Sequence, residues 1–188
     1  MKVKMRIPIL SILLLSMFAC GSDNLSNSKA EKVISKCLEL KPELRKANLR
    51  IGKATFSNKE YDQELLSKYI ALTDQGYLEM ELLKDITTGW RKGTQEYEVK
   101  LSEKALEYMH QIPENGNLAV AKTFAYEVDK VLEVQEIPSM NSATVKVQYK
   151  AVDITPFSIF SKKDPKEFLI DDLKMRKTSN GWKYCEDF

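Results

Sequence analysis

The chain has 188 residues, with 29 Lys and Arg against 27 Asp and Glu and a formal net charge of +2. This length can bury a substantial core, as one domain or as two small ones. Residues 1–19 carry three of the cations, Lys2, Lys4 and Arg6, so the rest of the chain has a net charge of about −1. A chain without net positive charge lacks the general attraction to polyanions, and we expect no nucleic-acid partner.

The first 20 residues have the pattern of a secretory signal peptide. A basic start is followed by the apolar run 7–18, and the chain turns polar after Ala19 and Cys20. The apolar run is shorter than the roughly 20 residues needed to cross a bilayer, so we expect it to be removed. A Cys directly after a small residue at the cut resembles the lipobox of bacterial lipoproteins. The resemblance implies a signal peptide over residues 1–19 and acylation of Cys20.

The lipoprotein resemblance also implies a location. Acylation of Cys20 would anchor the folded chain to a membrane through lipid, with the small polar residues of 20–28 as a tether. In Gram-negative lipoproteins an Asp directly after the Cys commonly favours the inner membrane, and Gly21 holds that position here. We therefore expect a cell-envelope protein, held at the outer membrane and facing the periplasm.

The first element predicted after the tether is an amphipathic helix over residues 29–40. Ser28 and Glu31 have the spacing of a capping box, apolar residues follow at the spacing of one helix face, and Pro42 ends the pattern. A short strand is expected next, over residues 48–56, where apolar and polar residues alternate.

The chain has three cysteines: Cys20 follows the predicted signal peptide, and Cys37 and Cys185 lie in the region expected to fold. If Cys20 is acylated, Cys37 and Cys185 remain as an even pair in a compartment where disulfides persist. Cys37 lies on the apolar face of the first predicted helix. We therefore expect a bridge that ties this helix to the last strand, and the alternative is two separate buried thiols.

Residues 57–112 predict a helix, a hairpin and a second helix. Ser57 is expected to cap the first helix, which Gly76 ends. Residues 78–101 alternate between apolar and charged positions on either side of a turn-rich stretch, which is typical of a hairpin with one solvated face. A further short helix is expected to end before Pro113. This order of elements resembles a winged-helix unit.

The second half of the chain is predicted to be mainly strands. Period-two alternation occurs over residues 118–134, 144–151 and 169–175. Asn180 and Gly181 then give a strong hairpin signal. The last hairpin, ending in Gly-Trp-Lys, is similar to the close of periplasmic cystatin-like or NTF2-like sheets.

Together these elements predict an α+β fold. Residues 29–113 are expected to form a helical, winged-helix-like half, and residues 114–188 a mainly antiparallel sheet of about four strands. Because the predicted disulfide would join the first helix to the last strand, we expect the two halves to share one core.

The sequence offers little for catalysis or for metal binding. His110 is the only histidine, and we expect it at the end of the helix before Pro113, where a cation favours the helix dipole. Ser26 and Lys29 have the Ser-x-x-Lys spacing of some acyl-enzymes, but they span the tether and the first helical turn. There is no glycine-rich phosphate loop and no cluster at metal-ligand spacing. We expect no enzymatic activity, no catalytic residues, no metal and no cofactor.

Aromatic residues on the predicted strands are the remaining candidates for a functional surface. These residues are Phe124, Tyr126, Tyr149, Trp182 and Tyr184. They either pack as ordinary core beneath a helix or line a face that binds a ligand or a partner. The expected function is a non-enzymatic binding or interaction module of the cell envelope. The alternative is a carrier of a small apolar ligand or lipid.

Overall fold

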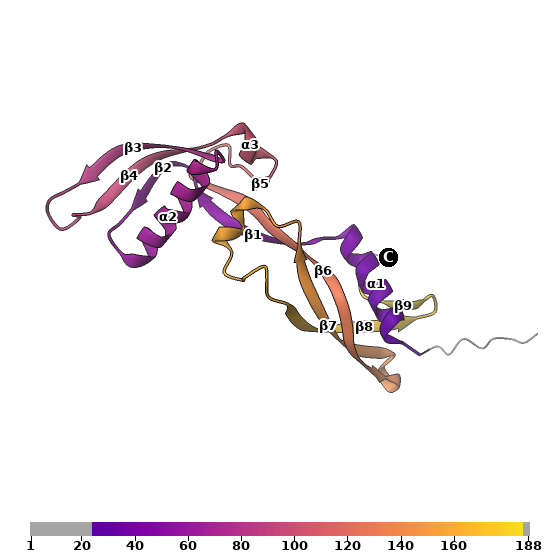
Figure 1. Ribbon diagram of the computed structural model, residues 1–188. Coiled ribbons are helices and arrows are strands. Elements are labelled where there is room, and N and C mark those ends of the chain that lie inside the picture. The colour runs from indigo at the N-terminus through magenta and orange to yellow at the C-terminus, as the bar shows by residue number, and fades with distance from the viewer. Residues whose placement is uncertain (1–23, 186–188) are drawn as a thin grey trace, which may run out of the picture.

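A computed structural model describes residues 24–185 as an elongated molecule of two lobes joined by a narrow waist (Figure 1). The predictions for residues 1–23 and 186–188, acylation of Cys20 among them, lie outside the described residues. Over residues 24–185, none of the helices combines the length and the apolar character that crossing a bilayer requires.

Two antiparallel sheets organise the chain. The larger has strand order β1-β6-β7-β8-β9, with β5 also paired to β6, and the smaller has strand order β2-β4-β3. The larger sheet consists of β1 (Glu43–Arg50), β5 (Met109–Gln111), β6 (Leu118–Ile137), β7 (Ser142–Val152), β8 (Leu169–Thr178) and β9 (Gly181–Lys183). The smaller sheet consists of β2 (Gly52–Phe56), β3 (Leu78–Ile86) and β4 (Thr94–Leu101).

The predicted α+β class is therefore confirmed, with corrections to its details. The main sheet has six strands rather than four. The β3–β4 hairpin forms as expected, but the structure does not show the winged-helix unit expected over residues 57–112. The segment after the hairpin holds only a one-turn helix, α3 (Glu103–Leu106), before the chain enters β5. Short β5 pairs with β6 and extends the sheet where a longer helix was expected.

The single strand expected over residues 48–56 is divided between the two sheets. β1 pairs with β6 in the larger sheet, whereas β2 pairs with β4 in the smaller one. The chain changes sheets at Ile51 and Gly52, and Gly52 has a φ of 64°. Glycine adopts this left-handed conformation without the steric penalty of a side chain, so the change of direction occurs there.

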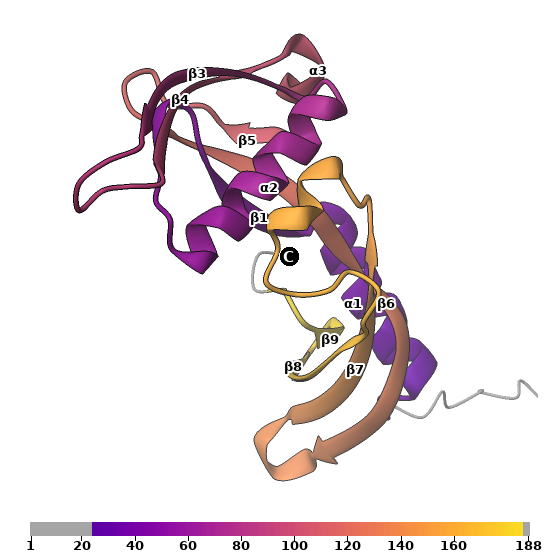
Figure 2. The same ribbon diagram turned by 60° about the vertical axis from the view of Figure 1, so that its left-hand side comes forward.

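The 20-residue strand β6 runs through both lobes and defines the waist. Its first part pairs with β1 and β5, and its second part pairs with β7. Register shifts between Val128 and Lys130 and between Val131 and Glu133 mark bulges, which bend a strand and increase its twist. β6 and β7 are visibly curved beside α1 (Asn27–Leu40) in the rotated view (Figure 2).

The disulfide lobe consists of α1 and the sheet formed by the second part of β6 with β7, β8 and β9. Helix α1 begins two positions earlier than the predicted cap would place it, because the Ser26 Oγ, rather than that of Ser28, accepts a hydrogen bond from the Lys29 N–H at 3.2 Å. Its buried face carries Ala30 and Ile34 against the sheet. The two-residue turn between Thr178 and Gly181 joins β8 to β9, as the hairpin signal predicted.

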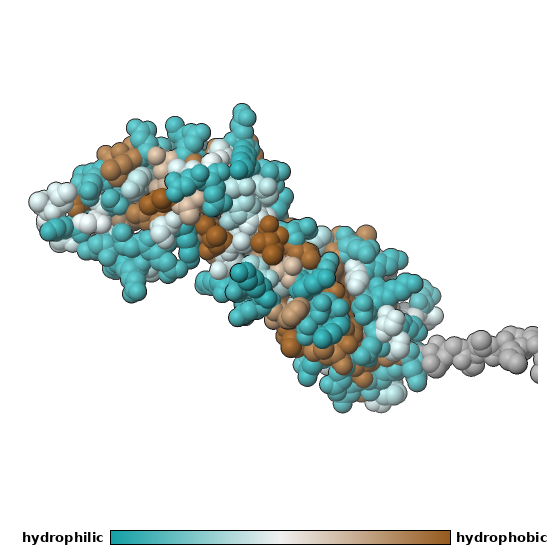
Figure 3. Space-filling model, in the orientation of Figure 1, coloured by the Kyte–Doolittle hydropathy of each residue, from teal (hydrophilic) through white to brown (hydrophobic). Residues whose placement is uncertain are grey.

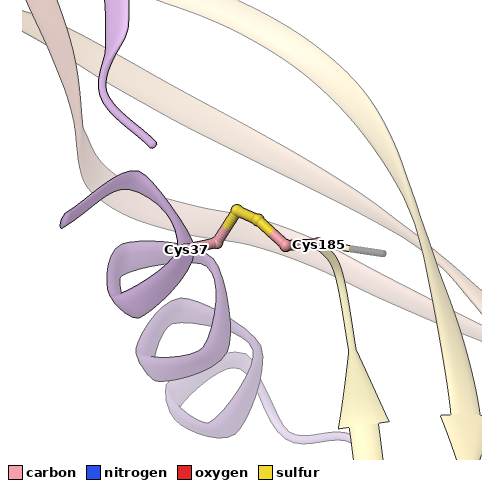
Figure 4. The surroundings of a disulfide bond; sticks show 2 residues. All are labelled: Cys37 and Cys185. Atoms are coloured by element: carbon pink, nitrogen blue, oxygen red, sulfur yellow. A yellow bond between two sulfur atoms is a disulfide. The ribbon is translucent and has the colours of Figure 1, made fainter. Parts of the chain in front are cut away.

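Cys37 and Cys185 form the expected disulfide (Figure 4). Their Cα atoms are 5.9 Å apart, and 148 positions separate them in the sequence. Cys37 lies on the buried face of α1, and Cys185 follows β9. The bridge therefore fastens the helix to the far edge of the sheet on which it packs.

The hairpin lobe consists of the smaller sheet, helix α2 (Glu60–Asp74), β5, the start of β6 and the one-turn helix η2 (Pro156–Phe160). The predicted Ser57 cap is not formed; Lys59 precedes the helix, and the Ser57 side chain bonds Asp62 instead. Gly76, with a φ of 76°, ends α2 as expected. The Tyr69 hydroxyl of α2 accepts a hydrogen bond from the Arg50 N–H, and burial raises the pKa of Tyr69 to about 12.

Two core clusters correspond to the two lobes and do not follow the sequence halves 29–113 and 114–188. Helix α1, from the first half, packs with β6 to β9, whereas η2, from the second half, packs in the hairpin lobe. Phe157 of η2 is fully buried against residues of the other sequence half.

Asp62, in the first turn of α2, is a nearly buried carboxylate that joins the helix to the strand before it. It accepts hydrogen bonds from the Ser57 N–H at 3.1 Å and from the Ser57 hydroxyl at 2.6 Å. The Arg50 Nη1 lies 3.2 Å away. Burial by itself raises the pKa of Asp62, but the Ser57 hydrogen bonds and the Arg50 charge together outweigh it, and the net effect lowers the pKa.

We expect Asp62→Asn to lower the free energy of unfolding by about 2 kcal/mol at neutral pH, because it removes hydrogen bonds to a charged group. The native pKa lies below the unfolded value, so this stabilisation is present above the ordinary pKa of 3.8 and is lost as the pH falls through the native pKa. Urea unfolding should show the wild-type advantage shrinking below pH 3.8. Glu64→Gln, on the exposed side of α2, is the control and should change little; an Asp62→Asn deficit that persists in strong acid would contradict the assignment.

Candidate functional site

The five aromatic residues predicted as a ligand or partner face do gather in the disulfide lobe, mostly as core. Tyr149 and Trp182 are buried in the cluster beneath α1, and Tyr184 is half-buried beside the disulfide. The rings of Phe124 and Tyr126 are 5.3 Å apart in an edge-to-face arrangement, and Tyr126 lies 6.2 Å from Tyr149. Phe124 and Tyr126 differ from the rest because each also lines a surface concavity at the waist.

The waist carries two adjoining concavities of about 480 Å³ each, which share Ala125 and Asp153 as lining residues. We call the pair the waist groove. Three strands place apolar side chains at its centre, because Leu44 of β1 pairs with Ala125 of β6, which pairs with Val152 of β7. Figure 3 shows hydrophobic residues at the surface of the waist, over β1 and β6.

Ile154 is the most exposed large hydrophobic residue of the waist groove, at 54%. The residue after it is fastened to β6: the Thr155 N–H donates to the Thr123 carbonyl at 2.9 Å, and the Thr155 hydroxyl donates to the Lys122 carbonyl at 2.6 Å. Asp153 on the other side has a φ of 51°, a conformation that Asp tolerates better than most residues. Ile154 is therefore held at the surface by a fixed backbone rather than by burial of its side chain.

The rim of the waist groove is mainly acidic. Four carboxylates line it, and one lysine, Lys122, stands among them. The carboxylates are Glu39, Glu107, Glu127 and Asp153. Glu127 forms an ion pair with Lys150, whose Nζ lies 2.9 Å from the carboxylate. The neighbouring Glu107 carboxylate raises the pKa of the Tyr108 phenol, so Tyr108 stays a neutral hydroxyl at the groove.

A second exposed feature is the turn between β3 and β4, residues 87–93, which we call the hairpin tip. Trp90 in this turn is 94% exposed, with the Arg91 guanidinium 5.9 Å from its ring centre. The turn is ordered by its own backbone: the Lys92 N–H donates to the Gly89 carbonyl at 3.1 Å and the Gly93 N–H to the Ile86 carbonyl at 2.7 Å. The hairpin tip projects from the hairpin lobe in both views and lies at the far left of the molecule in Figure 1 (Figures 1 and 2).

Sequence reasoning missed the waist groove and the hairpin tip. The turn-rich stretch between the two alternating strands was a signal for a hairpin, and an aromatic residue inside such a turn could have been recognised as exposed. No comparable signal existed for the groove, because its residues come from four separate segments.

His110, the one histidine, lies on β5 rather than at the end of a helix, which corrects its predicted position. Its Nε2 is 2.8 Å from the Lys46 Nζ, so the helix-dipole role expected for it has no structural basis. Across residues 24–185, no three His, Cys, Asp or Glu side chains group in a way that could hold a metal ion.

An apolar floor with an acidic rim can bind an apolar group that lies next to a cation. Apolar side chains contribute affinity through burial, and the carboxylates select for a cationic neighbour. No model of a known protein family matches this sequence, and no similar protein was found among the curated proteins or the solved structures.

Proposed function

We propose that this protein is a lipid-anchored, non-enzymatic binding module of the cell envelope, and that its partner docks in the waist groove. The lipobox-like sequence at Cys20 supports the anchor. The waist groove supports the binding role, and the single observation that carries the proposal is an exposed apolar floor enclosed by four carboxylates. The partner segment that fits this surface is apolar with a basic flank.

The fixed backbone and the acidic rim of the waist groove favour a polypeptide partner. Exposed Ile154 and partly exposed Leu44 sit on strands and turns that are already fixed, so docking costs little ordering of this chain. Binding a basic segment would also neutralise the uneven charge of the rim. The carrier alternative has less support, because Tyr149 and Trp182 are already packed against α1.

The test uses two variants of the full chain in the native host, with cross-linking of intact envelopes. Ile154→Lys removes an apolar contact and adds a cation that repels a basic partner, so the protein should stay in the membrane fraction and lose its cross-linked product. Cys20→Ser should instead release the protein from the membrane fraction. Fractionation and immunoblotting measure both effects and separate the anchor from the groove.

Ile170→Lys is the matched control for the groove. Ile170 is 55% exposed, against 54% for Ile154, but it lies on β8 away from the waist groove. It should retain the cross-linked product. Equal loss in both isoleucine variants would reject the groove as the docking site. A small apolar molecule that copurifies with wild type and is lost in Ile154→Lys would support the carrier alternative.

A further inference from the structure

We propose that the hairpin tip of one copy of this chain occupies the waist groove of a second copy. The inference rests on the proposed function, because it names the partner that fills the same groove. Two independent surfaces lead to it: a fully exposed Trp next to cations, and a groove lined with apolar residues and carboxylates.

The chemistry of the two surfaces is complementary. The hairpin tip offers the Trp90 ring with Arg91 and Lys92 directly after it in the sequence; Lys92 is exposed, and Arg91 also forms an ion pair with Glu96 at 3.2 Å. The waist groove offers an apolar floor with carboxylates at its rim. Seating Trp90 on the floor removes a large apolar surface from water, while the cations that follow it meet the acidic rim.

The two surfaces belong to different copies because of the shape of the molecule. The hairpin tip projects from the hairpin lobe, whereas β1 and β6, which supply lining residues of the waist groove, run between the lobes (Figures 1 and 2). Both surfaces are on ordered backbone: the tip turn is hydrogen-bonded within itself, and the segment at Ile154 is fastened to β6 through Thr155. A rigid tip at the end of the molecule cannot fold back onto its own waist, so docking is intermolecular.

The resulting contact is heterologous, because a tip meets a groove rather than its own equivalent. Each copy then retains a free tip or a free groove, so assembly continues as a chain unless it closes into a ring. A seven-residue turn covers less than the roughly 800 Å² per partner of a standard interface, so the contact is weak in dilute solution. Anchoring copies to one membrane would raise their effective concentration and promote assembly.

The experiment measures self-association of the purified full chain in nanodiscs by light scattering over a range of concentrations. Wild type should associate, and increasing salt should weaken the association by screening. Trp90→Ala and Ile154→Lys should each weaken it about 30-fold, the size of effect typical of a truncated hot-spot residue. Tyr61→Ala is the aromatic control, since Tyr61 is 61% exposed on α2 and belongs to neither the hairpin tip nor the lining of the waist groove, and it should associate as wild type does.

A mixing experiment tests the heterologous geometry directly. Trp90→Ala keeps an intact groove, and Ile154→Lys keeps an intact tip. Each variant alone should remain monomeric, but an equimolar mixture should form dimers and nothing larger, because only one complete interface can be made. The variants carry substitutions at exposed positions, and circular dichroism should confirm that both retain the wild-type fold.

Three results would overturn the inference. One is a wild-type protein that remains monomeric at every soluble concentration, and another is a mixture of the two variants that does not dimerise. The third is a Trp90 fluorescence shift that needs added lipid vesicles while no self-association occurs, which would assign the tip to a membrane surface. The proposed function survives each of these if Ile154→Lys still loses its envelope partner, so failure of the two proposals is distinguishable.

Discussion

Replacing Cys37 and Cys185 together with alanine should lower the free energy of unfolding by about 4–5 kcal/mol. The bridge closes a segment spanning 148 positions, and in the chain-entropy description the stabilisation grows with the length of the closed loop. The unfolded chain with the bridge intact has far fewer conformations than the chain without it. Urea unfolding followed by circular dichroism measures the difference.

Alanine rather than serine is the appropriate replacement, because Cys37 is buried on α1 and a serine hydroxyl there would add its own desolvation cost. Wild type unfolded in the presence of a reductant serves as the matched control and should resemble the double variant. Equal midpoints for oxidised wild type and the variant would show that the bridge does not stabilise the fold. A single replacement would leave one free thiol and is less informative.

Phe157→Ala should destabilise the protein by about 3–5 kcal/mol, the range for truncating a fully buried aromatic residue. Phe157 is the anchor of η2, and its ring centre is 5.9 Å from that of Tyr77 and 6.2 Å from that of Tyr108. The Phe157 N–H donates a hydrogen bond to the Thr155 hydroxyl oxygen at 3.2 Å. Removing the ring leaves a cavity among these aromatic side chains and loosens the segment that returns from β7 to the hairpin lobe.

The control is Ile159→Ala on the same turn of η2, where the side chain is partly exposed and the loss should stay below about 1 kcal/mol. Urea unfolding gives both values, and hydrogen exchange locates the change. Protection should fall first in η2 and β5, which belong to the same core cluster as Phe157 or lie against it. Similar losses in the two variants would indicate that η2 is not anchored through the Phe157 ring.

Local patterns in the sequence predicted most of the elements. Alternation over residues 78–101 and 144–151 identified strands, because one face of each is buried and successive side chains point to opposite faces. Gly76 marked a helix end and Gly181 followed a two-residue turn, both with positive φ. Each of these signals is contained within a few neighbouring residues.

The misplaced elements have two causes. Serines at capping spacing were available at both Ser26 and Ser28, and the helix used the first because its side chain reaches the Lys29 N–H. Ser57 was taken by Asp62, an interaction that depends on Arg50 in another strand. His110 was expected on a helix, but pairing of β5 with β6 made it part of a strand. The two helix starts were therefore decided by competing local hydrogen bonds, whereas the position of His110 was decided by pairing with a distant strand.

The sequence by itself determined the α+β class, the hairpins and the pair of cysteines that closes the fold, since each depends on periodicity, turn chemistry or parity. Only the tertiary structure decided the division into two lobes and the site between them. The chain changes sheets at Gly52, and β6 is shared by both lobes. Leu44, Ala125 and Ile154 become neighbours at the waist because long-range strand pairing brings them together, and no pattern confined to one segment encodes such a contact.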